Sequence, residues 1–321
     1  MQSRLVQSQN FYAKPFLKWM GGKGQLLKEI DKRLPKNVKN NEIDYYYEPF
    51  VGAGSVFFHL KNNYSIKTSI ISDINPELIL TYRTIQKDYK ELIKQLNPLK
   101  NNYKKLEKNI DEQKDYYKEI RDKFNDNLGK IDLNAKKIKK QHFERAAQMI
   151  FLNKTCFNGM FRVNKKGEFN VPAGRYKNPQ IYDENNLIEI NKLLNKDNVI
   201  IKTQDFSITE DYITEKSTSE NTFIYLDPPY RPLNKTSSFT QYYKNNFDDS
   251  EQIRLYKYIQ RLSKKKIPLM LSNSDSKTED NQSFFRNLYQ NQKVESVKAR
   301  RNINANGKKR NAIDELIITN Y

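Results

Sequence analysis

Cysteine and histidine are scarce in this chain of 321 residues: Cys156 is the one cysteine, and His59 and His142 are the two histidines. A single cysteine excludes an intrachain disulfide framework and a metal site built from several cysteines, and two histidines argue against a histidine-based metal cluster. No apolar run approaches the length of a membrane-spanning helix, and residues 1–10 lack the apolar core of a signal peptide. The sequence therefore predicts an intracellular, cytoplasmic protein with no metal site and no membrane contact.

Acidic residues are outnumbered by basic ones. Lysine and arginine number 57 against 38 aspartate and glutamate residues, which gives a formal net charge of +19. The basic residues are spread among 21 tyrosines and 17 phenylalanines, a mixture that suits a nucleic-acid groove better than a disordered basic tail. Codon bias in an A+T-rich genome explains part of the lysine and asparagine excess, but it does not require basic residues to outnumber acidic ones. An anionic partner is therefore expected.

Short runs of β-branched and aromatic residues alternate along the chain with helical segments. The predicted strands cover residues 45–50, 68–72, 199–203, 222–226, 269–272 and 315–319. Such alternation predicts an α/β fold with a doubly wound, mostly parallel sheet. A block at 88–195, whose first half is helical, charged and poor in glycine, interrupts the alternation. We therefore expect a first domain of residues 14–87 and 196–321, and a second, inserted domain of residues 88–195.

The sequence Asp227-Pro228-Pro229-Tyr230 directly follows the apolar run 222–226, which predicts a buried strand. Two prolines end this strand, because neither has an N–H for a β-ladder. The turn then lies at the carboxyl edge of the sheet, where open α/β sheets bind ligands. There the Asp227 carboxylate and the Pro228 carbonyl can accept both N–H bonds of an exocyclic amine, and the Tyr230 ring can stack on the base. A strand-terminating turn with a surface tyrosine is the simpler alternative.

A glycine turn and an acid form the second candidate site. Val51-Gly52-Ala53-Gly54 follows a predicted strand, but Phe57 stands where a dinucleotide-binding fingerprint needs its third glycine. The turn still allows close backbone approach to a ligand, and Asp73, after the next strand, can accept hydrogen bonds from ribose hydroxyls. Because the turn has no phosphate-binding lysine, it favours a nucleoside such as S-adenosylmethionine. Alternatively, Asp73 caps the helix expected at Pro76–Gln86.

A basic segment further along the chain contains a predicted β-hairpin. Residues 161–163 and 168–171 flank the turn signal Asn164-Lys165-Lys166-Gly167. A basic β-ribbon can enter the major groove, where Arg162 suits a bidentate contact with guanine and Met160 is a candidate wedge into the base stack. Because most protein–DNA hydrogen bonds go to phosphate and sugar, the residues alone favour a hairpin that contacts phosphates only.

Four motifs occur in the order seen in Dam-type DNA adenine-N6 methyltransferases, and the chain resembles that family from residue 14 to residue 321. The motifs are Lys18-Trp19-Met20-Gly21-Gly22-Lys23, Tyr47-Glu48-Pro49-Phe50-Val51-Gly52-Ala53-Gly54, Ser72-Asp73-Ile74-Asn75 and Asp227-Pro228-Pro229-Tyr230. One such motif is a weak signal, but four in order, with the insertion in the expected interval, are specific. The resemblance implies a Rossmann-like methyltransferase fold with an inserted DNA-recognition domain of helices and a hairpin at 157–176.

The resemblance also implies roles for individual residues. Asp227, Pro228 and Tyr230 are implied to be catalytic, and Asp205 and Phe206 to cap the cofactor adenine. The implied contacts with S-adenosylmethionine involve Trp19, Lys23, Glu48, Pro49, Phe50, Gly52, Gly54, Asp73, Asp205, Phe206 and Asp227.

The sequences FNGMFR and FNVPAGRY in the hairpin resemble the recognition hairpin of enzymes that act on GATC. The resemblance implies that Lys18 and Tyr176 address the first base pair and that Arg162 addresses the third or fourth. It places Pro172 near the methylated strand. The implied DNA-binding residues are Lys18, Phe157, Asn158, Met160, Arg162, Asn170, Pro172, Arg175 and Tyr176.

The expected reaction moves a methyl group to the adenine amine, whose lone pair is delocalised into the ring. Asp227 and the Pro228 carbonyl can hold both N–H groups and favour a pyramidal nitrogen as the methyl carbon approaches in line. The adenine must first be flipped from the duplex. The product is S-adenosylhomocysteine, and no covalent enzyme intermediate is needed, so Cys156 is not expected to be a nucleophile.

Several alternatives stay open at this stage. Phe157 replaces the tyrosine usual in the family and Met160 a frequent leucine, and a longer site beginning GAT would suit a related hairpin. Methyltransferases that modify adenine in RNA and methyltransferases that modify glutamine in proteins share the Pro-Pro-Tyr turn. The glutamine enzymes resemble an Asn-Pro-Pro-Tyr version, so Asp227 counts against them. A DNA-binding protein with a decayed site is a further class. We expect a monomer that binds double-stranded DNA and that has a cognate restriction endonuclease as a possible partner.

Overall fold

The computed structural model describes residues 11–213, 217–231, 247–276, 282–300 and 312–321. Within these residues the strands form one seven-stranded sheet in the order β3-β2-β1-β4-β5-β7-β6. The strands are β1 (Tyr45–Glu48), β2 (Thr68–Asp73), β3 (Asn198–Thr203), β4 (Thr222–Leu226), β5 (Leu269–Ser274), β6 (Lys293–Arg300) and β7 (Ala312–Thr319). The first five strands of this order pair in parallel, whereas β7 is antiparallel to both of its neighbours. The mostly parallel α/β sheet predicted from the sequence is therefore confirmed.

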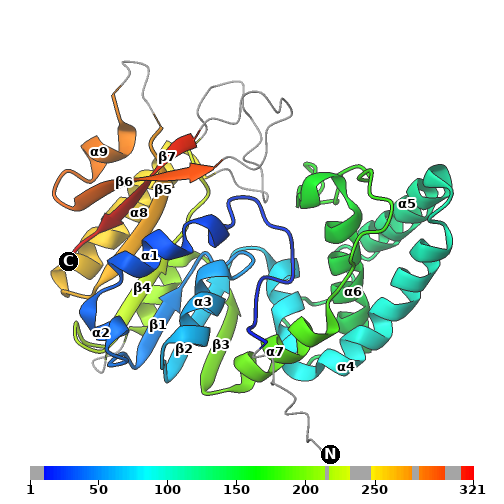
Figure 1. The fold of residues 1–321 in the computed structure, drawn as a ribbon, viewed down its shortest axis with the longest axis horizontal. Helices are drawn as coiled ribbons and strands as arrows, with labels where there is room; N and C mark the ends of the chain where they lie inside the picture. The colour runs from blue at the N-terminus through cyan, green and yellow to red at the C-terminus, as the bar shows by residue number, and fades with distance from the viewer. Residues whose placement is uncertain (1–10, 214–216, 232–246, 277–281, 301–311) are drawn as a thin grey trace, which may run out of the picture.

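Helices cover both faces of this sheet (Figure 1). They are α1 (Leu27–Arg33), α2 (Lys36–Lys39), α3 (Ser55–Asn63), α4 (Pro76–Lys105), α5 (Ile110–Asp126), α6 (Lys140–Thr155), α7 (Glu184–Asn195), α8 (Asp249–Lys264) and α9 (Phe284–Leu288). Alternation along β4 shows the two cores: Phe223 and Tyr225 belong to the cluster that includes residues of α1 to α7, whereas Ile224 and Leu226 belong to the cluster that includes residues of α8 and α9. All four side chains are fully buried, so the strand is apolar on both faces as buried parallel strands are.

The edge strand β6 is the element that the sequence did not predict. Four of its eight residues are charged, and among the described side chains of residues 293–298 only Val297 is buried. Because β6 pairs with β7 on one side only, its solvent-facing side chains need not be apolar. Strand β6 therefore contains no apolar run from which the sequence could have predicted it.

Helix α4 is broken at Asp88, somewhat before its middle. Asn75 caps its start by accepting hydrogen bonds from Glu77 N and Leu78 N, so Asn75 and not Asp73 is the N-cap that the sequence left open. At Asp88 the backbone leaves helical geometry, with φ −164° and ψ 96°, and its side chain accepts from the amides two and three residues on. The predicted end near Gln86 thus marks an interior break, after which the helix resumes.

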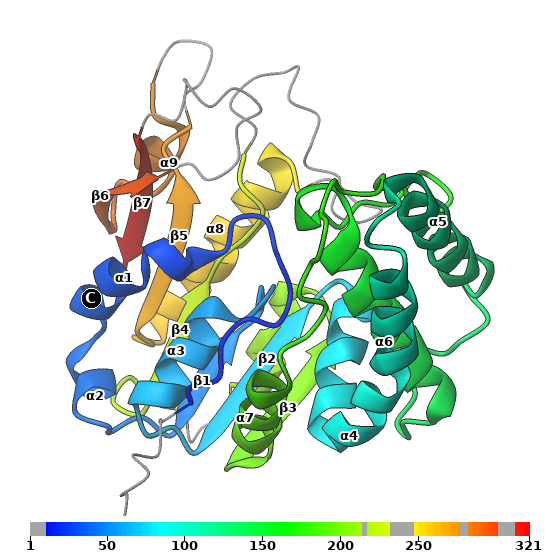
Figure 2. The ribbon, with the colours of Figure 1, turned by 45° about the vertical axis from the view of Figure 1, so that its right-hand side comes forward.

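Helices α4, α5 and α6 form a lobe beside the β3 edge of the sheet (Figures 1 and 2). A buried ion pair joins two of them, with Arg145 Nη2 lying 2.6 Å from Glu77 Oε1. The guanidinium also lies 3.4 Å from the centre of the Phe124 ring in α5 and donates to the Phe124 carbonyl. Because Glu77 stands in the first turn of α4, this cluster ties the lobe to the segment that follows β2.

After α6 the chain forms a hairpin. Asn164 N donates to Glu168 O at 2.9 Å and Asn170 N to Arg162 O at 3.1 Å, so the chain reverses across 164–167. Isolated bridges pair Val163 with Phe169 and, nearer the base, Cys156 with Ala173. The two arms are therefore held by a few separate bridges and not by two regular strands.

Candidate active site and nucleic-acid interface

Four acidic residues gather at the carboxyl edge of the sheet. Strands β1, β2, β3 and β4 run in parallel, so their carboxyl ends meet at the same edge. Glu48 ends β1 and Asp73 ends β2, while Asp205 and Asp227 follow β3 and β4 by one or two residues. The predicted cofactor and catalytic acids thus share one edge.

The glycine-rich loop before α1 reaches the turn after β4. Lys23 Nζ lies 2.7 Å from Asp227 Oδ1 and donates to the Gly21 carbonyl at 2.5 Å. The same ammonium lies 4.6 Å from the centre of the Tyr230 ring. Because Lys23 is 3% exposed, its charge is compensated mainly by Asp227 and the Tyr230 face. Motifs that are about two hundred residues apart in sequence therefore form one charged cluster.

The environment of Asp227 favours its neutral form. Burial raises the pKa of the Asp227 carboxyl to about 6, the Lys23 ammonium opposes this increase, and the Glu315 carboxylate adds to it. Glu48 lies close by, is 2% exposed, and accepts from the Tyr46 hydroxyl at 2.5 Å. Burial raises the pKa of Glu48 well above its usual range; the Tyr46 hydrogen bond lowers it, and the Asp227 carboxylate raises it further. Burial thus raises the pKa of both carboxyl groups, that of Asp227 to about 6.

Two contacts that the sequence did not reveal fix the Pro-Pro-Tyr turn. The Tyr230 hydroxyl donates to Glu315 Oε2 at 2.6 Å, and Gln252 Nε2 in α8 donates to the Pro229 carbonyl at 3.0 Å. Burial raises the pKa of Tyr230 well above its usual value, so the hydroxyl keeps its proton for this bond. Glu315 follows Asp314 directly before the apolar residues 316–318 of β7, and an acid at the start of an apolar run was the one available signal. Gln252 carries no such signal.

The glycine turn is packed closely from two sides. Gly54 has φ 77°, and a Cβ there would lie 2.5 Å from the Tyr82 hydroxyl, while a Cβ on Gly52 would lie 3.0 Å from Cδ1 of Trp19. Gly52 N donates to Asp73 Oδ2 at 3.1 Å, and Asn75 N donates to Asp73 Oδ1 at 3.0 Å. Burial raises the pKa of Asp73 to about 6, which the two backbone donors partly offset. Each carboxylate oxygen of Asp73 has a further lone pair for a ligand hydroxyl.

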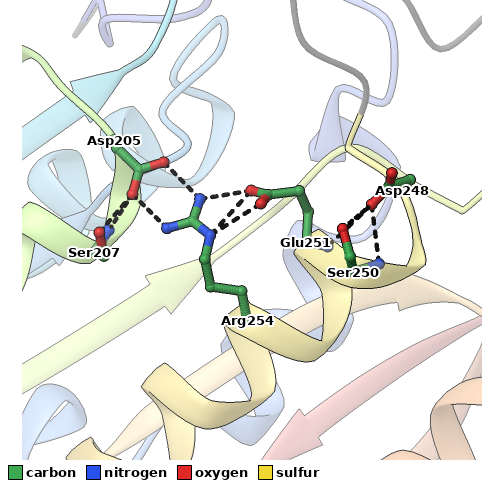
Figure 3. Close-up of polar contacts among 6 residues, drawn as sticks. All are labelled: Asp205, Ser207, Asp248, Ser250, Glu251 and Arg254. Atoms are coloured by element: carbon green, nitrogen blue, oxygen red, sulfur yellow. Dashed lines mark hydrogen bonds and ion pairs between the residues drawn. The ribbon is translucent and has the colours of Figure 1, made fainter.

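Asp205 is held by an arginine from α8 (Figure 3). Its two oxygens accept from Arg254 Nη1 and Nη2, each at 2.7 Å, and Oδ1 also accepts from Ser207 N and Oγ. Burial alone would raise the pKa of Asp205, but the Arg254 and Ser207 donors hold it at about 2. Arg254 is itself held by Glu251, 2.5 Å away. Asp205 is thus a permanent anion whose orientation is set by α8.

The aromatic side chain of Phe206 is enclosed by its neighbours. Its ring is 3% exposed, stacks on the Phe50 ring at 5.4 Å, and has the Arg254 guanidinium 4.0 Å from its centre. The ring of Phe50 is half-buried and also meets Phe247 edge-on at 5.7 Å. The structure therefore brings the predicted residues Phe50, Asp205 and Phe206 together, with Phe50 as the more accessible ring.

The predicted recognition residues lie on the hairpin and on the loop beside it. Lys18 Nζ lies 4.1 Å from the centre of the Tyr176 ring. Arg162 Nε donates to Asn170 Oδ1 at 2.8 Å, and Arg162 Nη2 donates to the Asn170 carbonyl at 3.3 Å, so Asn170 orients this guanidinium. Met160 is half-buried against the core. The exposed members of the set are Lys18, Phe157, Asn158, Pro172 and Arg175.

Cys156 lies at the base of the hairpin. It is fully buried, and its thiol donates to the Met160 carbonyl at 3.3 Å. Burial raises the pKa of the Cys156 thiol to about 12, so the nucleophilic thiolate is not formed near neutral pH. In the described part of the chain, no three His, Cys, Asp or Glu residues gather as a metal site would require. None of its helices is long and apolar enough to cross a membrane.

Comparison with known proteins identifies the family. A family model described as D12 class N6 adenine-specific DNA methyltransferase matches residues 19–303. The chain belongs to this family. The Type II methyltransferase M.MjaIII of Methanocaldococcus jannaschii is 48% identical over 309 residues, which cover 96% of this chain and 99% of the relative. Type II methyltransferase M1.LlaDCHI of Lactococcus lactis is 35% identical over 99% of both chains.

A third relative carries a different kind of name. The DNA adenine methylase of Escherichia coli K12 is 32% identical over 303 residues, covering 94% of this chain and 93% of the relative. Family and relatives together show that this protein is an adenine-specific DNA methyltransferase, whose substrate is DNA. The expected class of enzyme and the expected mostly parallel, Rossmann-like methyltransferase fold are thereby confirmed.

Proposed function

We propose that this DNA adenine-N6 methyltransferase takes its methyl group from S-adenosylmethionine, flips the target adenine out of double-stranded DNA, and methylates it within GATC. The observation that carries the choice of site is the pairing of Lys18 with Tyr176 beside an Arg162 that Asn170 orients. These side chains come from two separate segments. Lys18 pairs with an aromatic ring, and Arg162 adds a second basic group on the same hairpin, a combination of the kind that duplex recognition needs.

The residues at the sheet edge fit this cofactor. Asp73 has free lone pairs for ribose hydroxyls, and Gly52, which is partly exposed, donates its N–H to the same carboxylate beside the Trp19 ring. Phe50 offers a half-buried ring for the adenine, and Phe206 supports that ring from behind. Asp205, fixed by Arg254, supplies a negative edge. The other proposed contacts come from Trp19, Lys23, Glu48, Pro49 and Asp227.

Catalysis rests on the turn after β4. The Pro229 carbonyl is committed to Gln252, so the Pro228 carbonyl and the Asp227 carboxylate are the acceptors that we assign to the adenine amine. Tyr230 stacks on the flipped base, and its hydrogen bond to Glu315 fixes the plane of the ring. The bound cofactor supplies the methyl carbon. Asp227 can hold the proton that the amine nitrogen loses when the N–C bond forms, because its pKa of about 6 lies near neutral pH.

When the target adenine leaves the duplex and enters the active site, a side chain of the protein has to fill the space that the base leaves. The sequence suggested Met160 as the wedge, but Met160 packs against the core, whereas the Phe157 ring at the base of the same hairpin is 51% exposed. We assign the wedge to Phe157 and a supporting role to Met160. Asn158, Pro172 and Arg175 are exposed beside it and are assigned to contacts with the DNA.

The wider organisation follows from this assignment. Residues 14–87 and 196–321 form the catalytic domain, and residues 88–195 form the recognition domain with its hairpin at 157–176. The protein acts as a cytoplasmic monomer on the genome. Two relatives are named Type II methyltransferases, which supports pairing with a restriction endonuclease.

A methylome map tests the proposal. DNA from cells that express the protein should carry N6-methyladenine at GATC and resist an endonuclease that this methylation blocks. The Asp227→Ala variant should leave the same DNA unmethylated while it still binds duplex. Methylation confined to a longer sequence that begins GAT would replace GATC as the site, methylation of RNA alone would reject duplex DNA as the substrate, and turnover by Asp227→Ala would reject its catalytic role.

A further inference from the structure

Asn153 joins two segments that the proposed function uses for different purposes. It lies in the last turn of α6 and is 1% exposed. Its Oδ1 accepts from Lys18 N at 2.8 Å, and its Nδ2 donates both to the Lys18 carbonyl at 2.8 Å and to the Gly159 carbonyl at 2.9 Å. One amide group therefore binds the backbone of the loop before α1 and the backbone of the hairpin.

The two segments are in close contact where Asn153 holds them. Gly159 has φ 63°, and a Cβ there would overlap the Lys18 side chain at 2.3 Å, so this approach requires glycine. The Trp19 ring stacks on Phe161 of the hairpin at 5.9 Å. Figure 2 shows the loop before α1 running beside the segment that follows α6. A shift of the hairpin must therefore move the loop.

The loop leads directly to the active site. Five residues after Lys18 comes Lys23, whose ammonium lies 2.7 Å from Asp227 and against the Tyr230 ring. The hairpin, at the other end of the same contact, carries Arg162 and Tyr176, to which we assign base recognition. The contact between Lys18 and Gly159 thus connects the hairpin with the loop that carries Lys23 to Asp227.

We propose that Asn153 is a positioning residue that couples recognition of the correct DNA site to methyl transfer. The proposal rests on the assigned duplex DNA substrate, but not on which sequence is methylated. When the hairpin seats on the correct bases, the Asn153 amide transmits its position to Lys18 and so to the Lys23–Asp227 pair. On a wrong sequence the hairpin seats differently, and Asn153 carries that displacement to the same pair. The gain in rate on the correct site corresponds to a coupling free energy between the hairpin and the Lys23–Asp227 pair.

The chain offers a matched control in Asn186 at the start of α7. Its Oδ1 accepts from Lys14 N at 3.0 Å and its Nδ2 donates to the Lys14 carbonyl at 3.0 Å, and the side chain is 6% exposed. Asn186 therefore binds the backbone of the same N-terminal segment in the same way as Asn153. It differs in the point that matters, because its side-chain amide binds the backbone of Lys14 and not that of the hairpin.

The test compares Asn153→Asp with Asn186→Asp. Each aspartate keeps the size of the side chain and an acceptor for the backbone N–H, but it loses the donor to the carbonyls. The preferred site is first taken from the methylome of the unchanged protein. Single-turnover rates at saturating S-adenosylmethionine are then measured on that duplex and on duplexes with one base pair changed, together with melting temperatures and cofactor affinity without DNA.

Asn153→Asp should reduce the rate on the preferred duplex by on the order of tenfold, with little change on the altered duplexes. The ratio of the two rates then falls by a similar factor, and cofactor affinity without DNA is unchanged. Asn186→Asp should lower the melting temperature and leave the ratio intact. An unchanged ratio in Asn153→Asp, or an equal loss of ratio in both variants, overturns the proposal.

A second variant covers the case in which Asn153→Asp does not fold. Phe161→Leu removes the stack on Trp19 without burying a charge, and it should reduce the same ratio. If Asn153→Asp does not fold and Phe161→Leu keeps the full ratio, the coupling is rejected. Absence of DNA methylation by the unchanged protein would reject the proposed function instead, and it would do so before any variant is compared.

Discussion

At the scale of single residues, burial and a few neighbouring charges decide the chemistry of the site. Asp227 is the clearest example, because its carboxyl has a lysine on one side and two further acids nearby. Its raised pKa means that the group is neutral below about pH 6 and an acceptor above it. With the catalytic role that we propose for Asp227, the pH dependence of the reaction reports directly on this residue.

We expect kcat/KM to fall as the pH decreases below about 6, because protonation removes the anionic acceptor for the adenine amine. Lys23→Met should move this acid limb to higher pH, since the ammonium lowers the pKa of Asp227. Glu315→Gln should move the limb to lower pH, since the Glu315 carboxylate raises that pKa. The check is to measure rates at saturating cofactor across roughly pH 5 to 8 and to compare the pH midpoint of the acid limb between the variants. Shifts of both variants in one direction would contradict it.

Asp73→Ala should chiefly weaken binding of S-adenosylmethionine. The carboxylate is assigned to ground-state contacts with the ribose, and hydrogen bonds to a charged group contribute about 1.5–3 kcal/mol, which corresponds to a roughly 10- to 150-fold higher Kd. Calorimetric titration and kcat at saturating cofactor separate the effects. An unchanged Kd with a reduced kcat would show that Asp73 does not hold the ribose.

At the scale of elements, apolar runs predicted the parallel strands, because a strand buried on both faces has few polar residues. The same reasoning could not find β6, whose exposed edge permits charged residues. Nor could sequence show that Gln252, Arg254 and Glu315 hold the turn after β4 and the loop after β3. Those contacts join residues between 23 and 85 positions apart, and only the packing of α8 and β7 brings them together.

The lobe of α4, α5 and α6 should depend on the buried pair of Arg145 and Glu77. Glu77→Ala leaves the guanidinium without its carboxylate, and breaking such a pair costs about 3–5 kcal/mol in the free energy of unfolding. The exposed pair of Glu119 and Lys123 on α5 is the control, since Glu119→Ala should cost about 0.5 kcal/mol or less. Urea denaturation measures both. Similar small effects in the two variants would show that the buried pair does not stabilise the lobe.

Two substitutions in the hairpin should separate sequence specificity from overall affinity for DNA. Arg162→Ala removes an assigned base contact and should cost about 1–3 kcal/mol at one base pair, with relaxed specificity there. Lys165→Ala, at the exposed turn, should weaken all sequences alike and reduce the salt slope of binding by about one. Binding to a set of singly altered duplexes at several salt concentrations tests both. A uniform loss for Arg162→Ala would make it a phosphate contact.

At the scale of the whole molecule, the proposed function assigns methyl transfer to one edge of the sheet and base recognition to one hairpin. The four motifs were visible in the sequence because each is local, and together they located the site. The coupling between them was not visible, because Asn153 contacts Lys18 across 135 positions. The net charge of +19 surrounds both regions with a field that attracts DNA of any sequence. The proposed function therefore assigns discrimination between sequences to a step after encounter, at the hairpin and the turn after β4.

Methyl transfer to paired synthetic duplexes tests the central claim most directly. One duplex contains a single GATC, and its partner is identical except that both GATC adenines already carry an N6-methyl group. The account predicts that purified protein with labelled S-adenosylmethionine transfers label to the first duplex and none to the second. Equal incorporation into both duplexes would show that the adenine N6 of GATC is not the acceptor.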